Sequence, residues 1–197
     1  MCNCVVMGYP LLYGTTNQGK LEEVQALASQ LGVTVEGLEG VDRSAHGDPP
    51  VVAEDSGFYG VNALHKAGAY AAWSGRACLA DDTGIELEDL GGYPGVYSAR
   101  IGVRALQERL LAGVSYRARF VCCMAYAEAS GRRVTVTATL PGTFVAQRGD
   151  GVSTTGLEFS PYFIPHGETK SLHTLLRQGF CDSHRARALR SLLRAIR

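Results

Sequence analysis

In the stretch Leu11-Leu12-Tyr13-Gly14-Thr15-Thr16-Asn17-Gln18-Gly19-Lys20, a short apolar run passes through a polar, glycine-bounded loop into a helical pattern. Glycine lets the backbone approach a ligand closely, the N–H groups at the start of a helix favour an anion, and Lys20 adds a positive charge. Leu21 excludes the P-loop pattern, which requires serine or threonine after the lysine. The stretch therefore favours phosphate binding, although a plain helix start capped by Asn17 explains it equally well.

Beyond this stretch, strand and helix patterns alternate along the chain. Apolar runs bounded by turn residues indicate strands, and apolar residues spaced three and four apart indicate helices. The expected strands cover 11–16, 33–35, 77–80, 117–127 and 132–145, and the expected helices cover 19–31, 62–74 and 183–197. An irregular loop is expected over 40–50 and a turn-rich loop over 91–95. This alternation predicts an α/β fold in a single domain over 1–197.

Composition narrows the class of protein. The chain has 197 residues, of which 46% are hydrophobic, and a formal net charge of zero, so it is large enough to bury a full core without disulfides. Its six cysteines form no CxxC pair, and reduced thiols are the expected state, with Cys2-x-Cys4 as a metal or redox pair the weaker alternative. The sequence has no apolar run of membrane-spanning length and no broad basic surface pattern, so we expect a cytoplasmic protein that binds neither membrane nor nucleic acid.

A second polar stretch, Asp81-Asp82-Thr83-Gly84, follows the strand predicted over 77–80. Carboxylates where a strand meets a loop are candidate Mg²⁺ ligands, because Mg²⁺ prefers oxygen donors and keeps several waters and phosphate oxygens in its shell. Glu54, at the end of the irregular loop, is the candidate for a further carboxylate. A solvated turn explains the two aspartates as well. Together with the loop that ends at Lys20, the pattern predicts a metal-dependent enzyme that cuts a nucleoside triphosphate.

Five segments of the chain resemble the inosine triphosphate pyrophosphatase family in order and spacing. They are Thr15-Thr16-Asn17-Gln18-Gly19-Lys20, Asn62-Ala63-Leu64-His65-Lys66-Ala67, Ala80-Asp81-Asp82-Thr83-Gly84, Gly92-Tyr93-Pro94-Gly95-Val96-Tyr97-Ser98-Ala99-Arg100 and Ser183-His184-Arg185. Members of that family are cytosolic homodimers that use Mg²⁺ to hydrolyse nonstandard purine nucleoside triphosphates, such as ITP, dITP and XTP, to the monophosphate and pyrophosphate. The resemblance implies a mixed twisted sheet with flanking helices and two lobes around a central substrate cleft.

The resemblance also implies roles for individual residues. Asp82 is expected to bind Mg²⁺ with Glu54 and to accept a proton from the attacking water, while Asp81 tunes the charge beside it. Which aspartate is the general base stays open, because adjacency does not fix geometry. Lys20 completes the expected catalytic set. Residues expected to contact the substrate are Thr15, Thr16, Asn17, Gln18, Gly19, Lys20, Lys66, Thr83, His184 and Arg185.

The departures from the family gather in the segment expected to read the base. Where the family carries Gly-Phe-Gly-Tyr-Asp-Pro, this chain has Gly156-Leu157-Glu158-Phe159-Ser160-Pro161. Loss of the stacking aromatic removes roughly 1 kcal/mol beyond ordinary apolar contact, and a carboxylate now lies close to the base or the phosphates. Leu157, Glu158, Phe159 and Ser160 are still expected to bind substrate. Two further positions differ, since Gly179 replaces an expected lysine and Val61 an expected glutamate.

Three hypotheses follow from these residues. The first is a Mg²⁺-dependent pyrophosphatase of deaminated purine nucleotides that cleanses the nucleotide pool. The second is the same reaction on a modified or pyrimidine triphosphate, which the altered residues Leu157, Glu158 and Ser160 would select. The third is a nucleotide-binding protein without catalysis, which the changes at Gly179 and Ser160 would signal. All three expect a small-molecule nucleotide as partner.

Overall fold

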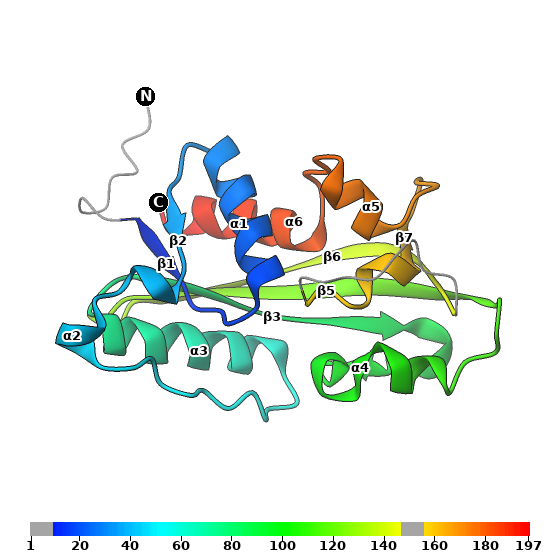
Figure 1. Cartoon of the computed structure of the whole chain (residues 1–197), viewed down its shortest axis with the longest axis horizontal. Coiled ribbons are helices and arrows are strands. Elements are labelled where there is room, and N and C mark those ends of the chain that lie inside the picture. Colours follow the sequence, from blue (N-terminus) through cyan, green and yellow to red (C-terminus); the bar gives the residue numbers. More distant parts are fainter. Residues whose placement is uncertain (1–9, 147–155) are drawn as a thin grey trace.

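A computed structural model describes residues 10–146 and 156–197 of the chain, so the Cys2-x-Cys4 pair lies outside the described residues. Its strands form one mixed sheet in the order β2-β1-β3-β5-β6-β7, with β4 paired to β3 (Figure 1). β2, β1 and β3 run parallel, and the remaining pairs are antiparallel. The strands are β1 (Leu11–Tyr13), β2 (Val35–Glu36), β3 (Cys78–Leu87), β4 (Pro94–Gly95), β5 (Ser115–Ala127), β6 (Arg133–Val145) and β7 (Phe163–Pro165).

Helices cover both faces of this sheet (Figure 1). The helix α3 packs on one face, against β3 and β5, whereas α6 packs on the other face against β5 and β6 and also contacts α1. The α-helices are α1 (Gln18–Gln30), α2 (Arg43–His46), α3 (Tyr59–Ser74), α4 (Ser98–Gln107), α5 (Leu172–Arg177) and α6 (His184–Ala195). This architecture confirms the predicted α/β fold with a mixed sheet and flanking helices. In the described part of the chain, no helix is long and apolar enough to cross a membrane.

The core follows the alternation of side chains along β3. Leu79 faces the cluster under α1 and α6, where Val24 and Leu189 are fully buried. Cys78 and Ala80 face the opposite cluster, which packs against α3. A third cluster fills the far end of the sheet beside α4 and α5, where the rings of Phe120 and Phe163 pack edge to face. Because successive residues of a strand point to opposite faces, each face of β3 is tied to a different helix layer.

Several predicted boundaries were displaced. The first strand ends at Tyr13 and not at 16, and the second shifts to Val35–Glu36. The helix predicted over 62–74 is α3, which begins at Tyr59, three residues before the predicted start. The loop predicted over 40–50 holds the short helix α2, whose first turn is capped when the Asp42 carboxylate accepts from the Ser44 N–H at 2.9 Å. The helices predicted over 19–31 and 183–197 are confirmed within two residues at each end.

One displaced boundary changes the chemistry. The strand predicted over 77–80 continues as β3 to Leu87, so Asp81 and Asp82 lie in the middle of a strand and not where a strand meets a loop. Ladder pairs with β5 hold them there, Asp81 opposite Met124 and Asp82 opposite Cys123. The prediction failed because a polar pair is typical of a turn, whereas cross-strand pairing keeps this one extended. Consecutive strand residues face opposite ways, so the two carboxylates lie on different faces of the sheet.

Candidate active site

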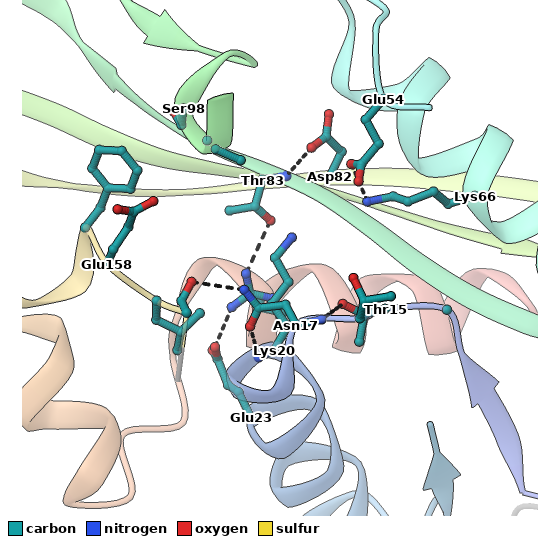
Figure 2. Close-up of a pocket in the computed structure, with 18 of the residues that line it drawn as sticks. Thr15, Asn17, Lys20, Glu23, Glu54, Lys66, Asp82, Thr83, Ser98 and Glu158 are labelled. Atoms are coloured by element: carbon teal, nitrogen blue, oxygen red, sulfur yellow. Dashed lines mark hydrogen bonds and ion pairs between the residues drawn. The ribbon is translucent and has the colours of Figure 1, made fainter. Parts of the chain in front are cut away.

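A cleft opens where β3 has a free edge. β1 pairs with β3 at Cys78 and Leu79, and β4 pairs with it at Ile85 and Glu86. Between these pairings, along 80–84, no strand of the described chain covers that edge. A cavity of about 560 Å³ lies there, and side chains from both faces of the sheet reach it (Figure 2). The free edge is therefore the place where the α3 layer and the α1 layer contribute to one site.

On the side of the sheet that α3 covers, Asp82 lines the cavity together with the carboxylate of Glu54 and the ammonium group of Lys66. The Asp82 carboxylate accepts from Asn62 Nδ2 at 2.8 Å and from the Thr83 N–H at 2.9 Å. Lys66, on α3, donates to Glu54 Oε2 at 2.5 Å and to the main-chain oxygen of Asp81 at 2.6 Å. Burial raises the pKa of Asp82 above its ordinary value, and the negative charge of Glu54 adds to this shift.

On the α1 side, Asp81 is 1% exposed and takes donors from several elements. Its carboxylate accepts from Thr83 Oγ1 at 2.5 Å, from Lys20 Nζ at 3.2 Å and from the buried hydroxyl of Tyr13. Arg185 Nε on α6 donates to the same carboxylate at 3.4 Å. The Asp81 side chain is absent from the cavity wall, so it acts through the groups that it holds.

A buried row of charges links Asp81 to α1 and α6. The Arg185 guanidinium is 1% exposed and also forms an ion pair with Glu23, whose carboxylate accepts from Ser183 Oγ at 2.5 Å. Although burial opposes ionisation, Lys20, Arg185 and Lys66 together hold the pKa of the Asp81 carboxyl well below its usual range. The row therefore fixes Lys20 and Thr83 at the cavity, and Arg185 is the cation that the buried carboxylates of Asp81 and Glu23 share.

The loop between β1 and α1 forms the end of the cavity nearest these charges. Asn17 Oδ1 accepts from the Lys20 N–H at 3.0 Å, which confirms Asn17 as the N-cap, and its Nδ2 donates to the Gly156 oxygen at 3.0 Å. Thr15 Oγ1 accepts from the Asn17 N–H at 3.1 Å. The loop is thus braced by its own side chains while Lys20 reaches the cavity (Figure 2). Capping and anion binding are compatible, because a capped helix still presents its positive N-terminal dipole.

The opposite end of the cavity is apolar and aromatic. The His184 ring stacks on Phe120, with ring centroids 4.5 Å apart and planes 9° apart. His184 Nδ1 is buried and has no hydrogen-bond partner in the described chain. Burial, followed by the charge of Arg185, lowers the pKa of His184 well below its ordinary value, so the imidazole is neutral. A flat apolar wall with one neutral ring nitrogen suits a planar heterocycle better than a phosphate.

Because His184 stays neutral in the folded protein, acid destabilises the fold. The unfolded chain takes up a proton near pH 6.5 while the folded chain does not, so this contribution to stability is present above pH 6.5 and is lost below it. The variant His184→Phe keeps the stack on Phe120 and cannot titrate. When the pH is lowered from 7 to 5, we expect the free energy of unfolding of the wild type, measured in urea, to fall by roughly 2 kcal/mol more than that of the variant. An equal pH dependence in both proteins would show that His184 titrates normally.

Most of the residues predicted from the sequence meet at this cavity. Its wall contains Thr15, Thr16, Asn17, Lys20, Glu54, Lys66, Asp82, Thr83, Leu157, Glu158, Phe159, Ser160, His184 and Arg185. Three predicted residues lie elsewhere. Asp81 is behind the wall, Gln18 donates to Glu22 at 3.0 Å on the exposed side of α1, and Gly19 lines a separate neighbouring cavity.

Sequence reasoning missed four contributors to the site, namely Tyr13, Glu23, Asn62 and Phe120. Glu23 lies one helical turn after Lys20, so its place on the same helix face was readable from the spacing. Asn62 occurs in a segment that resembled the family, yet it was not given a role. Tyr13 and Phe120 carry no sequence signal beyond apolar strand residues. Their partners, Asp81 and His184, are 68 and 64 positions away along the chain.

The donor set at the free edge fits a hard divalent cation. Among the described residues, no group of three or more histidine, cysteine or acidic side chains forms a complete metal cage. Glu54 and Asp82 nevertheless both line the cavity, and the raised pKa of Asp82 reflects in part their mutual repulsion. Two carboxylates with room for water and phosphate oxygens match the incomplete protein shell that Mg²⁺ takes in phosphate chemistry. The residues present therefore fit such an ion.

Comparison with known proteins agrees with this arrangement. Residues 11–195 match the family described as the Ham1 family. A protein named dITP/XTP pyrophosphatase from an Exiguobacterium species is 36% identical over 193 residues, which cover 92% of this chain and 94% of that protein. A protein of the same name from Thermus thermophilus is 33% identical over 203 residues, which cover 97% of this chain and 93% of that protein.

Solved structures share the fold. A HAM1 protein from Coxiella burnetii superposes with a TM-score of 0.73 at 23% identity, covering 95% of this chain and 98% of that one. A nucleoside-triphosphatase and dITP/XTP pyrophosphatase from Mycobacterium abscessus has a TM-score of 0.66 at 26% identity, covering 96% of this chain and all of that one. The family resemblance expected from the sequence is confirmed, and the chain belongs to the Ham1 family.

Proposed function

We propose that the protein hydrolyses nonstandard purine nucleoside triphosphates, such as ITP, dITP and XTP, to the monophosphate and pyrophosphate. One observation carries the proposal: the free edge of β3 presents Asp82, Glu54 and Lys66 from one face and Lys20 from the other. Two ammonium groups offset the charge of a triphosphate, and a cleft-facing carboxylate lies beside them. The names of the relatives, dITP/XTP pyrophosphatase, support the same reaction.

Each residue then has a physical task. Lys20 and the loop before α1 bind and orient the phosphates, and Lys66 approaches them from the opposite face of the sheet. Asp82 is the proton acceptor for the attacking water, because it lines the cavity, where a water beside the phosphates can reach its carboxylate. Asp81 is unsuited to this role, since Lys20, Thr83, Tyr13 and Arg185 occupy its oxygens. It positions Lys20 and Thr83.

The cofactor is proposed to be Mg²⁺, held by Glu54 and Asp82. When bound, such an ion neutralises phosphate charge and lowers the pKa of bound water. The stacked pair Phe120 and His184 forms one wall for the base and excludes water from it. Thr83, which donates to Asp81, also lines the cavity.

The oligomeric state and the cellular location rest on the family. We propose a homodimer in the cytoplasm that takes a small-molecule nucleotide and no nucleic acid. Phe58 and Val61, which are 74% and 54% exposed, supply apolar surface that a second copy would cover.

The experiment that tests the function is a steady-state comparison of triphosphates. Pyrophosphate release with Mg²⁺ is measured for ITP, dITP and XTP beside ATP, CTP and UTP. We expect kcat/KM for at least one 6-oxopurine substrate to exceed that for ATP, CTP and UTP by 10²-fold or more. Equal turnover of all six, or turnover of none, would contradict the proposal.

A further inference from the structure

The course of β3 gives the cavity a direction. Ile85 pairs with Phe120, on which the His184 ring stacks, so this part of the strand marks the base end. Asp82 lies nearer the start of the strand, and Cys78 is its first residue. Cleavage to a monophosphate and pyrophosphate breaks a bond at the α-phosphorus, so the nucleoside and the leaving pyrophosphate extend from that atom in opposite directions. With the base against Phe120 and the α-phosphorus near Asp82, the pyrophosphate points towards Cys78.

Tyr70, on α3, lines the cavity at the Cys78 end. Its ring lies beside Gly14, where an added Cβ would overlap the ring and would lie 3.1 Å from Cys78 Sγ. Tyr70 comes one helical turn after Lys66, and helical side chains point back towards the N-terminus of their helix. The ring therefore leans towards Lys66 and lies against the start of the loop between β1 and α1. Lys66 and that loop are the two groups proposed to bind the phosphates.

The Tyr70 hydroxyl brings a hydrogen-bond donor to apolar surroundings. Tyr70 is 5% exposed, and the apolar cluster around it contributes Leu38 and Val52 to the wall of the same cavity. Neither of these side chains can form a hydrogen bond with a phosphate. Burial raises the pKa of the Tyr70 hydroxyl, so the group stays protonated and keeps its donor. A phosphate oxygen at this end of the cavity can therefore accept from Tyr70, where Leu38 and Val52 offer no donor.

We propose that Tyr70 is a substrate-binding residue that donates a hydrogen bond to the leaving pyrophosphate. The assignment rests on the proposed function for the direction of the substrate in the cavity. Negative charge grows on the leaving oxygens as the bond breaks, and a hydrogen bond to a charged acceptor strengthens with that charge. Tyr70 then contributes to the binding of ITP and of pyrophosphate. It contributes nothing to the binding of IMP, which ends at the α-phosphate.

The test compares the wild type with Tyr70→Phe, which keeps the ring beside Gly14 and removes only the hydroxyl. Dissociation constants for pyrophosphate and for IMP are measured by calorimetry with Mg²⁺, and kcat/KM is measured for ITP. We expect the affinity for pyrophosphate and kcat/KM to fall about tenfold each, while the affinity for IMP stays within about twofold of the wild type. The matched control is Tyr126→Phe, because the Tyr126 hydroxyl donates to Glu128 at 2.7 Å and Tyr126 is absent from the cavity wall. It is expected to leave all three quantities unchanged.

Binding and turnover separate this inference from the function on which it rests. A selective loss of pyrophosphate affinity in Tyr70→Phe, with no triphosphate turned over by the wild type, would support the role of Tyr70 and overturn the proposed reaction. Turnover of ITP with an unchanged affinity for pyrophosphate in the variant would overturn the role of Tyr70 and leave the reaction standing. An equal fall in the affinities for pyrophosphate and IMP would also overturn that role, because a hydroxyl that only supports the fold affects both ligands.

Discussion

Replacing Asp82 by asparagine is expected to lower kcat for pyrophosphate release by about 10³-fold, because the variant loses the cleft-facing base. The amide keeps an oxygen for the Thr83 N–H and fills the same volume, so the fold is expected to survive. Circular dichroism and the urea midpoint check the fold, and single-turnover kinetics with ITP measure the chemical step.

The matched control for this variant is Glu86→Gln. Glu86 lies on the same strand and the same face as Asp82, but it pairs with Arg119 at 2.7 Å and is absent from the cavity wall. We expect its kcat to stay within twofold of the wild type. If Asp82→Asn kept a tenth or more of wild-type kcat, Asp82 would not be the base.

Replacing Arg185 by methionine is expected to destabilise the protein by about 3–5 kcal/mol, because it leaves the carboxylates of Asp81 and Glu23 buried without their shared cation. The free energy of unfolding in urea measures this loss. Loss of activity accompanies it, since Arg185 itself lines the cavity and donates to Asp81 and Thr83.

Arg187 on the same helix is the control for the Arg185 variant. Its guanidinium is 37% exposed and pairs with Asp182, which is itself half exposed. Surface pairs contribute roughly 0–1 kcal/mol, so Arg187→Met is expected to cost at most that amount. Equal destabilisation by the two substitutions would mean that the buried row of charges contributes nothing particular to the fold.

Local patterns in the sequence predicted the elements whose signals are local. The helix α1 was found because Leu21, Val24 and Leu27 repeat at helical spacing and Asn17 supplies a side-chain cap, both of which act within a few residues. The hairpin of β5 and β6 was found for the same reason, since its strands are long and its turn contains Gly131. These signals need no knowledge of distant partners.

The elements that were missed depend on partners far along the chain. β3 continues through its two aspartates because β5 pairs with it over the whole length, which a local pattern cannot reveal. α4 escaped notice because Gly102 breaks its helical geometry. Asp81 could be predicted as important, but its place on the opposite face from Asp82 follows only once the strand is known to run through.

The resemblance to a family identified the site residues more reliably than the spacing did. Lys66 and Arg185 have no local pattern that marks them as parts of one cavity, since they lie on opposite faces of the sheet. The free edge of β3 brings the two faces together, and that edge exists because β1 stops at Tyr13. A short first strand, which the sequence predicted as longer, is what opens the cleft.

The most direct test is to identify the products of ITP hydrolysis by ³¹P NMR, with Mg²⁺ and with EDTA. The account predicts IMP and pyrophosphate in equal amounts with Mg²⁺, and no products within the same time in EDTA. Release of IDP and inorganic phosphate would place the attack at the wrong phosphorus. Undiminished pyrophosphate release in EDTA would contradict the role given to Glu54 and Asp82.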